Sequence, residues 1–481
     1  MKKKFLSNLA LLLFLNLLIK PFWFFGIEVA VQNRVGEEMY GFYFSLFNFA
    51  FILNILLDSG ITNFNNRNIA RHPDRLRESM AQIVPLKFIL AIVYAGIVFI
   101  TGWIIGYNQV QFNMLVILAL NQFLASMILY MRSNISGLQL FRTDSLLSVL
   151  DRTLMILITG VLLWSNLFQE PFRIEWFVYA QTASYILTLG VVTLLVLKRS
   201  GTLIMSWRRT HLKNILRQSY PFAILILLMA FFNRADSVMI ERLLPDGKAE
   251  AGIYAQSFRI LDAVSQFSLL FAGLLLPMFS RMLKTGEQTR DLVRMAAGIL
   301  LSVSIGVAIA GNFYKTDIIN LLYHRVERHS DRIFGYLMIS YVFIATSYIY
   351  GTLLTANRNL KQLNTLALIT VILNISLNLV LIPEFKALGA AWASMISQGF
   401  YAVSQVVTAH RTLRLPLPKS FILQLLFFTM SSFAAGYTIR EFLDNRWLGF
   451  LLLCFILAAL VLLLRLINLR EIRDTLLYEE S

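Results

Sequence analysis

Charged side chains inside long apolar runs are the residues of this sequence that could do chemistry. Lys20 interrupts the first run, and Arg234 and Asp236 lie close together within a later one. Arg259 and Asp262 follow in the next run, spaced by one helical turn. If these runs cross a membrane, each charge costs roughly 2.5 to 3.5 kcal/mol to insert, so each position is a candidate functional site.

The composition places these runs in a membrane. Of the 481 residues, 57% are hydrophobic and 15% are charged, and the mean hydropathy is +0.66, values that are rare for a soluble protein. Much of the net charge of +16 lies in short loops between apolar runs, which predicts membrane topology and not nucleic-acid binding. The single cysteine, Cys454, excludes a disulfide framework and a cysteine-based metal site. We therefore expect an all-α polytopic membrane protein with no metal and no cofactor.

At about 20 apolar residues per span, the sequence predicts about fourteen transmembrane helices. They lie at residues 5–31, 39–61, 83–106, 112–137, 146–165, 175–197, 219–244, 251–280, 293–313, 333–356, 363–382, 388–410, 420–440 and 446–467. About 26 Lys and Arg residues fall in one set of loops and both termini, against about 10 in the opposite loops. The positive-inside rule then predicts that both termini are cytoplasmic, with the longest basic loops at 63–79 and 198–219.

A short motif recurs in the two halves of the chain. Gly41-Phe42-Tyr43 opens the second predicted span, and Gly252-Ile253-Tyr254 opens the eighth, at an offset of 211 residues. Many transporters are built from such internal repeats. We predict an N-terminal six-helix lobe at 1–200, a cytoplasmic linker at 201–218, a second six-helix lobe at 219–412, and a two-helix segment with a cytoplasmic tail at 413–481.

The charges of the apolar runs are predicted to share one layer of the membrane. At the rise of a helix, Lys20 and Arg234 lie about 22 Å from the cytoplasmic ends of their spans, and Arg259 lies about 12 Å from the opposite surface. There the basic side chains would present a cationic surface to a pyrophosphate, whose oxygens suit the planar fork of arginine. A structural alternative stays open, in which Arg234 pairs with Asp262, or Asp236 with Arg259.

Two further charges are candidates. Arg132, nearer the cytoplasmic side, is the best placed of the charges there to meet an anionic headgroup, whereas most of its neighbours lie near span ends where long side chains can reach water. Glu28 could be a cation or proton site or a simple interfacial charge. The aromatic run at residues 22–25 could stack on sugar rings, or face lipid or the protein core.

Residues 374–399 predict two helices that meet at a tight turn. Asn374 and Asn378 lie one helical turn apart on one face of the first helix. Pro383 is expected to end that helix, because the residue before a proline is disfavoured in α conformation. Gly389 and the small residues that follow it open the next helix and allow close backbone packing inside a membrane.

This motif resembles the later half of bacterial polysaccharide flippases, whose superfamily also contains multidrug-and-toxin extruders and lipid II flippases. Residues 36–71 and 234–281 resemble the second helix with its following loop, and the seventh and eighth helices, of the same flippases. One departure is Lys386, which stands where that family usually carries a glycine.

The resemblance implies a transporter of the bacterial inner membrane that moves a polyprenyl-pyrophosphate-linked oligosaccharide from the cytoplasmic to the periplasmic leaflet. Two lobes would alternate about a central cavity, with membrane lipids and a polysaccharide polymerase as partners. The predicted substrate-binding residues are Lys20, Arg132, Arg234 and Arg259, and the predicted ion-coupling or charge-pairing residues are Glu28, Asp236 and Asp262.

Two other functions stay open. A cation-coupled multidrug extruder would have the same architecture but an acidic site for organic cations. A membrane glycan polymerase or ligase would rely on Arg325, Arg328 and His329 in a short periplasmic loop. The sequence has no glycine-rich phosphate loop and no D-x-D of the kind a metal-dependent sugar-nucleotide enzyme would use, so we expect a protein that is not an enzyme.

Overall fold

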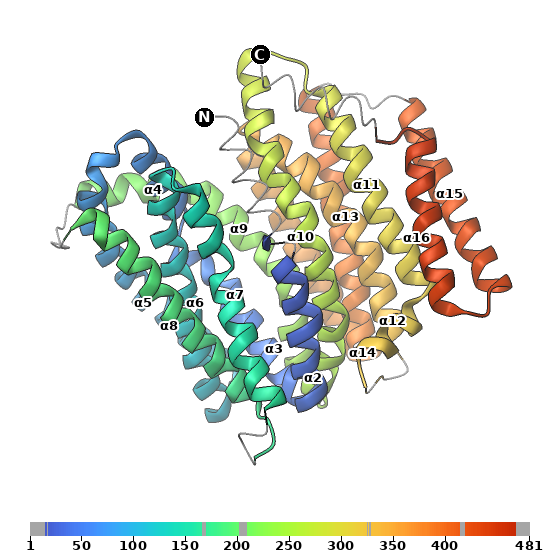
Figure 1. The fold of residues 1–481 in the computed structure, drawn as a ribbon, viewed down its shortest axis with the longest axis horizontal. Helices are drawn as coiled ribbons and strands as arrows, with labels where there is room; N and C mark the ends of the chain where they lie inside the picture. Colours follow the sequence, from blue (N-terminus) through green and yellow to red (C-terminus); the bar gives the residue numbers. More distant parts are fainter. Residues whose placement is uncertain are drawn as a thin grey trace. The chain divides into compact units, whose positions relative to one another are not determined.

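The computed structural model describes residues 15–16, 18–165, 170–201, 209–324, 326, 329–413 and 419–467, without the side chains of 209–219. Every regular element of this part of the chain is a helix (Figure 1). The chain divides into two compact units, the first reaching to Arg242 and including Asp246–Gly252, and the second holding Leu243–Pro245 and the chain from Ile253 onward. The boundaries predicted from the sequence repeat remain a prediction.

The first unit is built from helices that lie side by side. They are η1 (Phe22–Glu28), α2 (Val29–Val35), α3 (Glu37–Ile52), η2 (Asn54–Leu57), α4 (Ile61–Arg71), η3 (Pro73–Arg75), α5 (Leu76–Ile105), α6 (Gln109–Gly137), α7 (Phe141–Trp164), α8 (Ile174–Ser200) and most of α9 (Arg209–Leu243). A buried apolar cluster joins α4, α5, α6 and α8, with Ile69, Met80 and Tyr130 among its members. The cluster also includes Leu147 on α7, so it packs together α6 and α7, two helices that carry residues of the candidate site.

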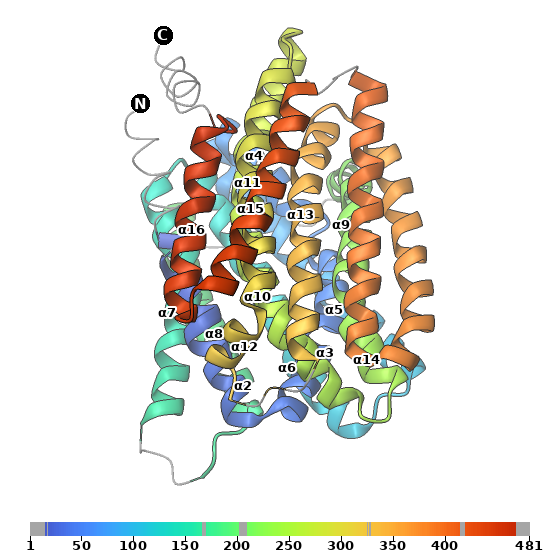
Figure 2. The same cartoon turned by 90° about the vertical axis from the view of Figure 1, so that its right-hand side faces the viewer.

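The second unit contains the remaining helices, and in Figure 2 the long helices α11, α13 and α14 run in a similar direction. They are α10 (Gly247–Thr285) beyond its first turns, α11 (Arg290–Phe313), α12 (Lys315–Leu322), α13 (Ser330–Ala356), α14 (Leu360–Leu413), α15 (Lys419–Phe442) and α16 (Arg446–Leu463). Helix α13 packs against both α11 and α14, and α15 packs against α11 and α16.

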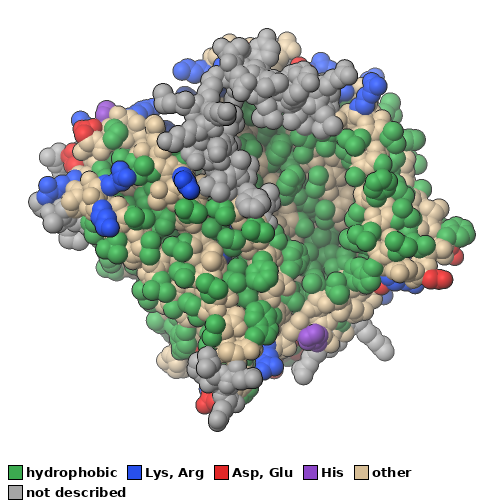
Figure 3. All heavy atoms as spheres, viewed as in Figure 1, with side chains coloured by type: hydrophobic (Ala, Val, Ile, Leu, Met, Phe, Trp, Pro, Cys, Tyr) green, Lys and Arg blue, Asp and Glu red, His purple; other side chains and the backbone are tan. Residues whose placement is uncertain are grey.

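The described residues contain eleven helices that are long and apolar enough to cross a membrane, or up to twelve if the pair α3 and η2–α4, bent by 47°, forms one span. Helix α14 has 54 residues and covers two predicted spans, while the first predicted span begins in residues outside the described part. Hydrophobic side chains are spread widely over the face seen in Figure 3, as expected of membrane-facing helices. The predicted all-α polytopic membrane fold is confirmed.

The turn within α14 differs from the prediction at one residue. Helical backbone continues past Pro383, and the only non-helical backbone angles described within α14 are at Lys386, with φ 53° and ψ −136°. The prediction that Pro383 ends the helix is therefore wrong by three residues. A proline removes one hydrogen bond to the preceding turn but does not itself reverse the chain. The reversal needs a residue with positive φ, and Lys386 provides it.

One basic loop is also more ordered than predicted. Residues 61–71, most of which were expected in the cytoplasmic loop at 63–79, form helix α4. Gly60 begins the helix from a left-handed conformation with φ 82°, and Ile61, Asn65 and Ile69 form its buried face. These buried residues recur every four positions and so form one face of the helix. Helix α4 packs against α6.

Candidate functional site

The first unit gathers basic residues from three helical segments. Lys20 lies in the helical turn before η1, Arg132 on α6 and Arg152 on α7. Lys20 is half-buried and within electrostatic range of Arg152, Asp151 and Arg132. The fold thus brings Lys20 and Arg132, two of the predicted substrate-binding residues, within electrostatic range of each other. Their role in substrate binding stays a prediction.

Arg132 is held by a carboxylate from the neighbouring helix. Its Nε donates to Asp144 Oδ1 at 2.9 Å, and its Nη2 donates to the backbone carbonyl of Asp144 at 3.4 Å. The side chains of Arg132 and Asp144 are 18% and 15% exposed, so the pair is reachable without being fully solvated. Such a pair keeps a charge inside an apolar bundle at a lower cost than a single ion.

Arg152 lies against an aromatic ring and several acidic groups. Its guanidinium carbon is 5.3 Å from the centre of the Trp23 ring, and its Nε is 3.9 Å from Asp151 Oδ2. It is also within electrostatic range of Glu28 and Tyr185. With 33% of its side chain exposed, Arg152 is the most accessible of these paired charges. An arginine on an aromatic face keeps its edge available for oxygen ligands.

Trp23 belongs to the core and not to a sugar-stacking surface. It is 2% exposed, stacks on Phe177 with ring centres 5.7 Å apart, and donates from Nε1 to Glu28 Oε1 at 3.1 Å. Phe22 and Phe25 are the exposed members of the aromatic run. Glu28 is itself buried among protein side chains, at 4% exposure.

The helix that carries Lys20 changes geometry immediately after it. The helix continues through Pro21, but residues Phe22–Glu28 form a π-helix before α2 resumes regular α geometry. Wide turns of this kind occur where the ordinary hydrogen-bond ladder is disturbed, here by a proline, and are frequent at functional sites. This widened segment places Trp23 and Glu28 beside Arg152.

Arg234 occupies a different place in the first unit. Its Nη1 lies 3.4 Å from Asn48 Oδ1, and its guanidinium carbon lies 5.1 Å from the centre of the Phe51 ring, both on α3. Asn48 also donates to Ser237 Oγ at 2.8 Å. Asp236, on the same helix as Arg234, is fully buried. These contacts tie α9 to α3.

Arg259 and Asp262 belong to the second unit. Their closest charged atoms, Arg259 Nη1 and Asp262 Oδ2, are 3.9 Å apart on one turn of α10, and the side chains are 7% and 17% exposed. This is a charge pair within a single helix.

The asparagine motif is a packing element of the second unit. Asn374 and Asn378 are both fully buried, and Asn378 Nδ2 donates to Asn374 Oδ1 at 3.2 Å, which confirms their common face. A side chain on Gly389 would overlap the Leu381 carbonyl oxygen. The predicted close approach of the two arms of α14 is therefore confirmed.

The sequence interpretation missed Arg152 as a site residue. Arg152 and Asp151 were grouped with charges near span ends, although α7 starts at Phe141, so Arg152 lies about 16 Å along it. The sequence did not show this depth, because the predicted span began at residue 146 and left Arg152 within two turns of its end. Among the predicted enzyme residues, Arg325 and Arg328 lie outside the described residues. The described part contains no group of three His, Cys, Asp or Glu residues that could hold a metal ion.

A family model described as Polysaccharide biosynthesis protein matches residues 5–283, more than half of the chain. The chain belongs to this family. No curated protein sequence matches this polysaccharide biosynthesis protein. The predicted membership is confirmed by the family match.

Solved structures share the fold of this polysaccharide biosynthesis protein. The lipid II flippase MurJ in an inward closed conformation aligns over 98% of this chain and 99% of its own, with a TM-score of 0.69 and 14% identity. An inward-facing multidrug resistance transporter of the MATE family aligns over 81% and 94%, with a TM-score of 0.62 and 14% identity. A MOP superfamily transporter from Pyrococcus furiosus aligns over 85% and 95%, with a TM-score of 0.58 and 16% identity. The protein therefore has the MOP superfamily fold.

Proposed function

We propose that this protein is a flippase that moves a polyprenyl-pyrophosphate-linked oligosaccharide from the cytoplasmic to the periplasmic leaflet of a bacterial inner membrane, with both termini cytoplasmic. Its family and fold support a transporter for polysaccharide biosynthesis. The observation that carries the substrate class is the group formed by Lys20, Arg132 and Arg152 within the first unit.

The cationic group suits a pyrophosphate because each arginine has a carboxylate partner that a pyrophosphate can replace. Arg132 and Arg152 each have a carboxylate partner, and both keep part of the side chain exposed. The partners stabilise the empty site, since an uncompensated charge in an apolar bundle is costly. A pyrophosphate offers more negative charge and more acceptor oxygens than one carboxylate, so it can replace that partner with bidentate hydrogen bonds.

The rest of the substrate follows from its own chemistry. The oligosaccharide must stay in contact with water or polar groups, because burying unpaired hydroxyls costs free energy. The polyprenyl chain gains free energy by remaining in lipid. A protein that binds only the pyrophosphate firmly therefore lets the oligosaccharide and the polyprenyl chain follow the pyrophosphate across the membrane.

The test is leaflet reorientation of a lipid-pyrophosphate-linked oligosaccharide in proteoliposomes that contain only this protein. Exposure of the sugar to an external lectin or glycosidase is the readout. We expect Arg132→Ala and Arg152→Ala to slow exposure by about tenfold or more, the effect of losing one charged contact of about 1.4 kcal/mol. Arg173→Ala is the matched control, because Arg173 pairs with Glu170 at an exposed position. Equal rates in all variants would refute the cationic site.

One observation favours a second candidate, the cation-coupled extruder. The fold is shared with a multidrug resistance transporter, and two carboxylates, Glu28 and Asp236, are buried. Uptake of an organic cation driven by an ion gradient, lost on Glu28→Gln and indifferent to Arg152→Ala, would move the assignment to that class. Growth of the glycan chain in the same vesicles would instead indicate a polymerase or ligase.

A further inference from the structure

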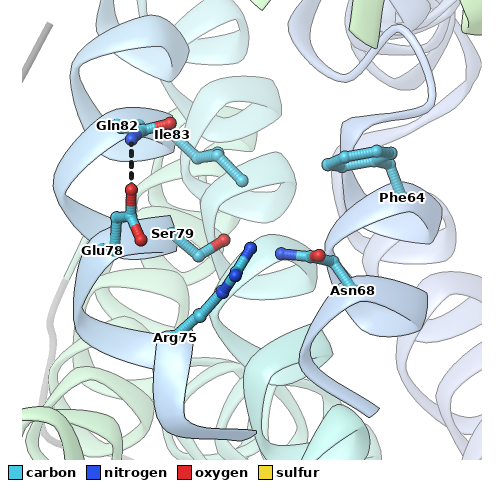
Figure 4. Close-up of a pocket in the computed structure, with 7 residues that line it drawn as sticks. All are labelled: Phe64, Asn68, Arg75, Glu78, Ser79, Gln82 and Ile83. Atoms are coloured by element: carbon cyan, nitrogen blue, oxygen red, sulfur yellow. Dashed lines mark hydrogen bonds between the residues drawn. The ribbon is translucent and has the colours of Figure 1, made fainter. Parts of the chain in front are cut away.

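A second site lies in the first unit, between α4 and the start of α5. Figure 4 shows this pocket, whose empty space is about 620 Å³ including its open mouth. Helix α4 supplies Phe64 and Asn68, η3 supplies Arg75, and the first turns of α5 supply the rest of the wall. None of these residues takes part in the cationic group around Lys20.

The floor of the pocket is polar and fixed. Ser79 and Gln82 are 8% and 7% exposed. Ser79 Oγ donates to Asn65 Oδ1 at 2.7 Å. The Nδ2 of Asn65 donates in turn to Ser133 Oγ at 2.8 Å and to Asn134 Oδ1 at 2.9 Å on α6. These hydrogen bonds join three helices, so the pocket keeps its shape without a ligand.

The mouth of the pocket carries two side chains that point toward each other. In Figure 4 the Arg75 guanidinium and the Asn68 amide point toward one another, with the Ser79 hydroxyl on the other side of the Arg75 tip. Within the described part of the chain, neither side chain has a hydrogen bond or an ion pair. The acidic residue of the wall, Glu78, accepts a hydrogen bond from Gln82 Nε2 at 3.4 Å. A cation and an amide donor are thus directed at the same space.

We propose that this pocket binds the phosphate group of an anionic phospholipid. Arg75 would contribute charge-assisted hydrogen bonds, and the amide of Asn68 would contribute a neutral donor to the same phosphate. Phe64 and Ile83 form apolar walls against which the glycerol and the first acyl carbons can pack.

The position of the pocket fits a lipid ligand. It lies in the basic segment at 63–79, which the positive-inside rule assigns to the cytoplasmic face. Arg67 and Arg71 are exposed on α4 and add to the positive potential there. Anionic lipids are attracted to such segments by about 1 kcal/mol per basic residue near the surface. A bound headgroup would stabilise α4 against α5.

The experiment is lipid binding to the full-length protein in detergent, followed by native mass spectrometry during titration with phosphatidylglycerol. We expect Arg75→Ala to weaken binding by about tenfold, and Arg75→Lys to weaken it less, because a lysine keeps the charge but not the fork. Arg71→Ala is the matched control, since Arg71 is an exposed arginine of the same segment that does not line the pocket. Melting temperatures of all variants check that they are folded.

Two comparisons make the result decisive. Equal weakening by Arg75→Ala and Arg71→Ala would overturn the proposed site, because it would show that general surface charge binds the lipid. The absence of any bound phosphatidylglycerol would also overturn it. Phosphatidylcholine, whose headgroup has no net charge, should bind at least about tenfold more weakly. Inorganic phosphate that binds alone with the same dependence on Arg75 would support the phosphate site but assign it to the free ion.

Discussion

Gly41 on α3 and Gly252 on α10 meet at a crossing that leaves no room for a side chain on either residue. A Cβ atom on Gly41 would overlap the carbonyl oxygen of Lys248, and one on Gly252 would overlap the carbonyl oxygen of Glu37. In each case the contacted residue precedes the other glycine by four positions, as in a contact with two-fold symmetry. These are the two glycines of the predicted repeat, which stays a prediction.

The close crossing predicts that replacing Gly252 by alanine lowers stability much more than the same change at an uncrowded glycine. Gly252→Ala should destabilise the protein by about 1 to 3 kcal/mol or more, because the new methyl group overlaps fixed backbone. Gly190→Ala is the control, since nothing lies within 4 Å of its added Cβ. The measurement is the melting temperature in detergent together with the yield of folded protein. Matching melting temperatures for the two variants would contradict the close crossing.

The backbone conformation of Lys386 predicts that glycine is more stable than alanine at this position. Its φ of 53° is readily adopted by glycine and strained for a residue with a side chain. Lys386→Gly should therefore be more stable than Lys386→Ala by about 1 kcal/mol. Both variants remove the lysine charge and its contacts, so only the Cβ differs between them. An alanine variant as stable as the glycine variant would show that this turn has another conformation.

Glu241 is predicted to hold the end of α9 to the first turn of α6. Its carboxylate accepts from Arg242 Nε at 2.6 Å and from Gln111 Nε2 at 2.8 Å, with 2% of the side chain exposed. Glu241→Gln should destabilise the protein by about 1.5 to 3 kcal/mol, the effect of losing hydrogen bonds to a buried charged group.

The control for Glu241 is an exposed acidic residue with the same kind of partner. Glu170 pairs with Arg173 at 3.0 Å, with both side chains at least 60% exposed. Glu170→Gln should change stability by less than about 1 kcal/mol. Thermal unfolding in detergent compares the two variants, and equal shifts would argue against a buried clamp.

Arg132 is predicted to need its fork and not only its charge. Arg132→Lys should retain part of the flipping rate that Arg132→Ala loses, because lysine keeps one charged contact but cannot form two parallel hydrogen bonds to phosphate oxygens. A loss of about tenfold for alanine and a smaller loss for lysine would fit this role. The measurement is the lectin-accessibility rate in proteoliposomes at matched protein content. A lysine variant as slow as alanine would point to packing against Asp144 as the main role of Arg132.

The sequence by itself determined the features that depend on near neighbours in the chain. Hydropathy predicted the membrane helices, because spanning a lipid layer requires about 20 apolar residues whatever they pack against. The four-residue spacing of Asn374 and Asn378 placed them on one face, as their hydrogen bond confirms. Small residues after Gly389 predicted a close helix approach for the same local reason.

Only the tertiary structure decided which distant residues share a site. Lys20 and Arg152 are far apart in sequence and come within electrostatic range of each other where a proline and a π-helix reshape the first segment beside α7. The pocket at Arg75 exists because buried hydrogen bonds from Asn65 join α4 to α5 and α6. The turn at Lys386, and not at Pro383, depends on backbone strain that the surrounding packing has to hold. Each of these outcomes rests on contacts between segments, which no local pattern encodes.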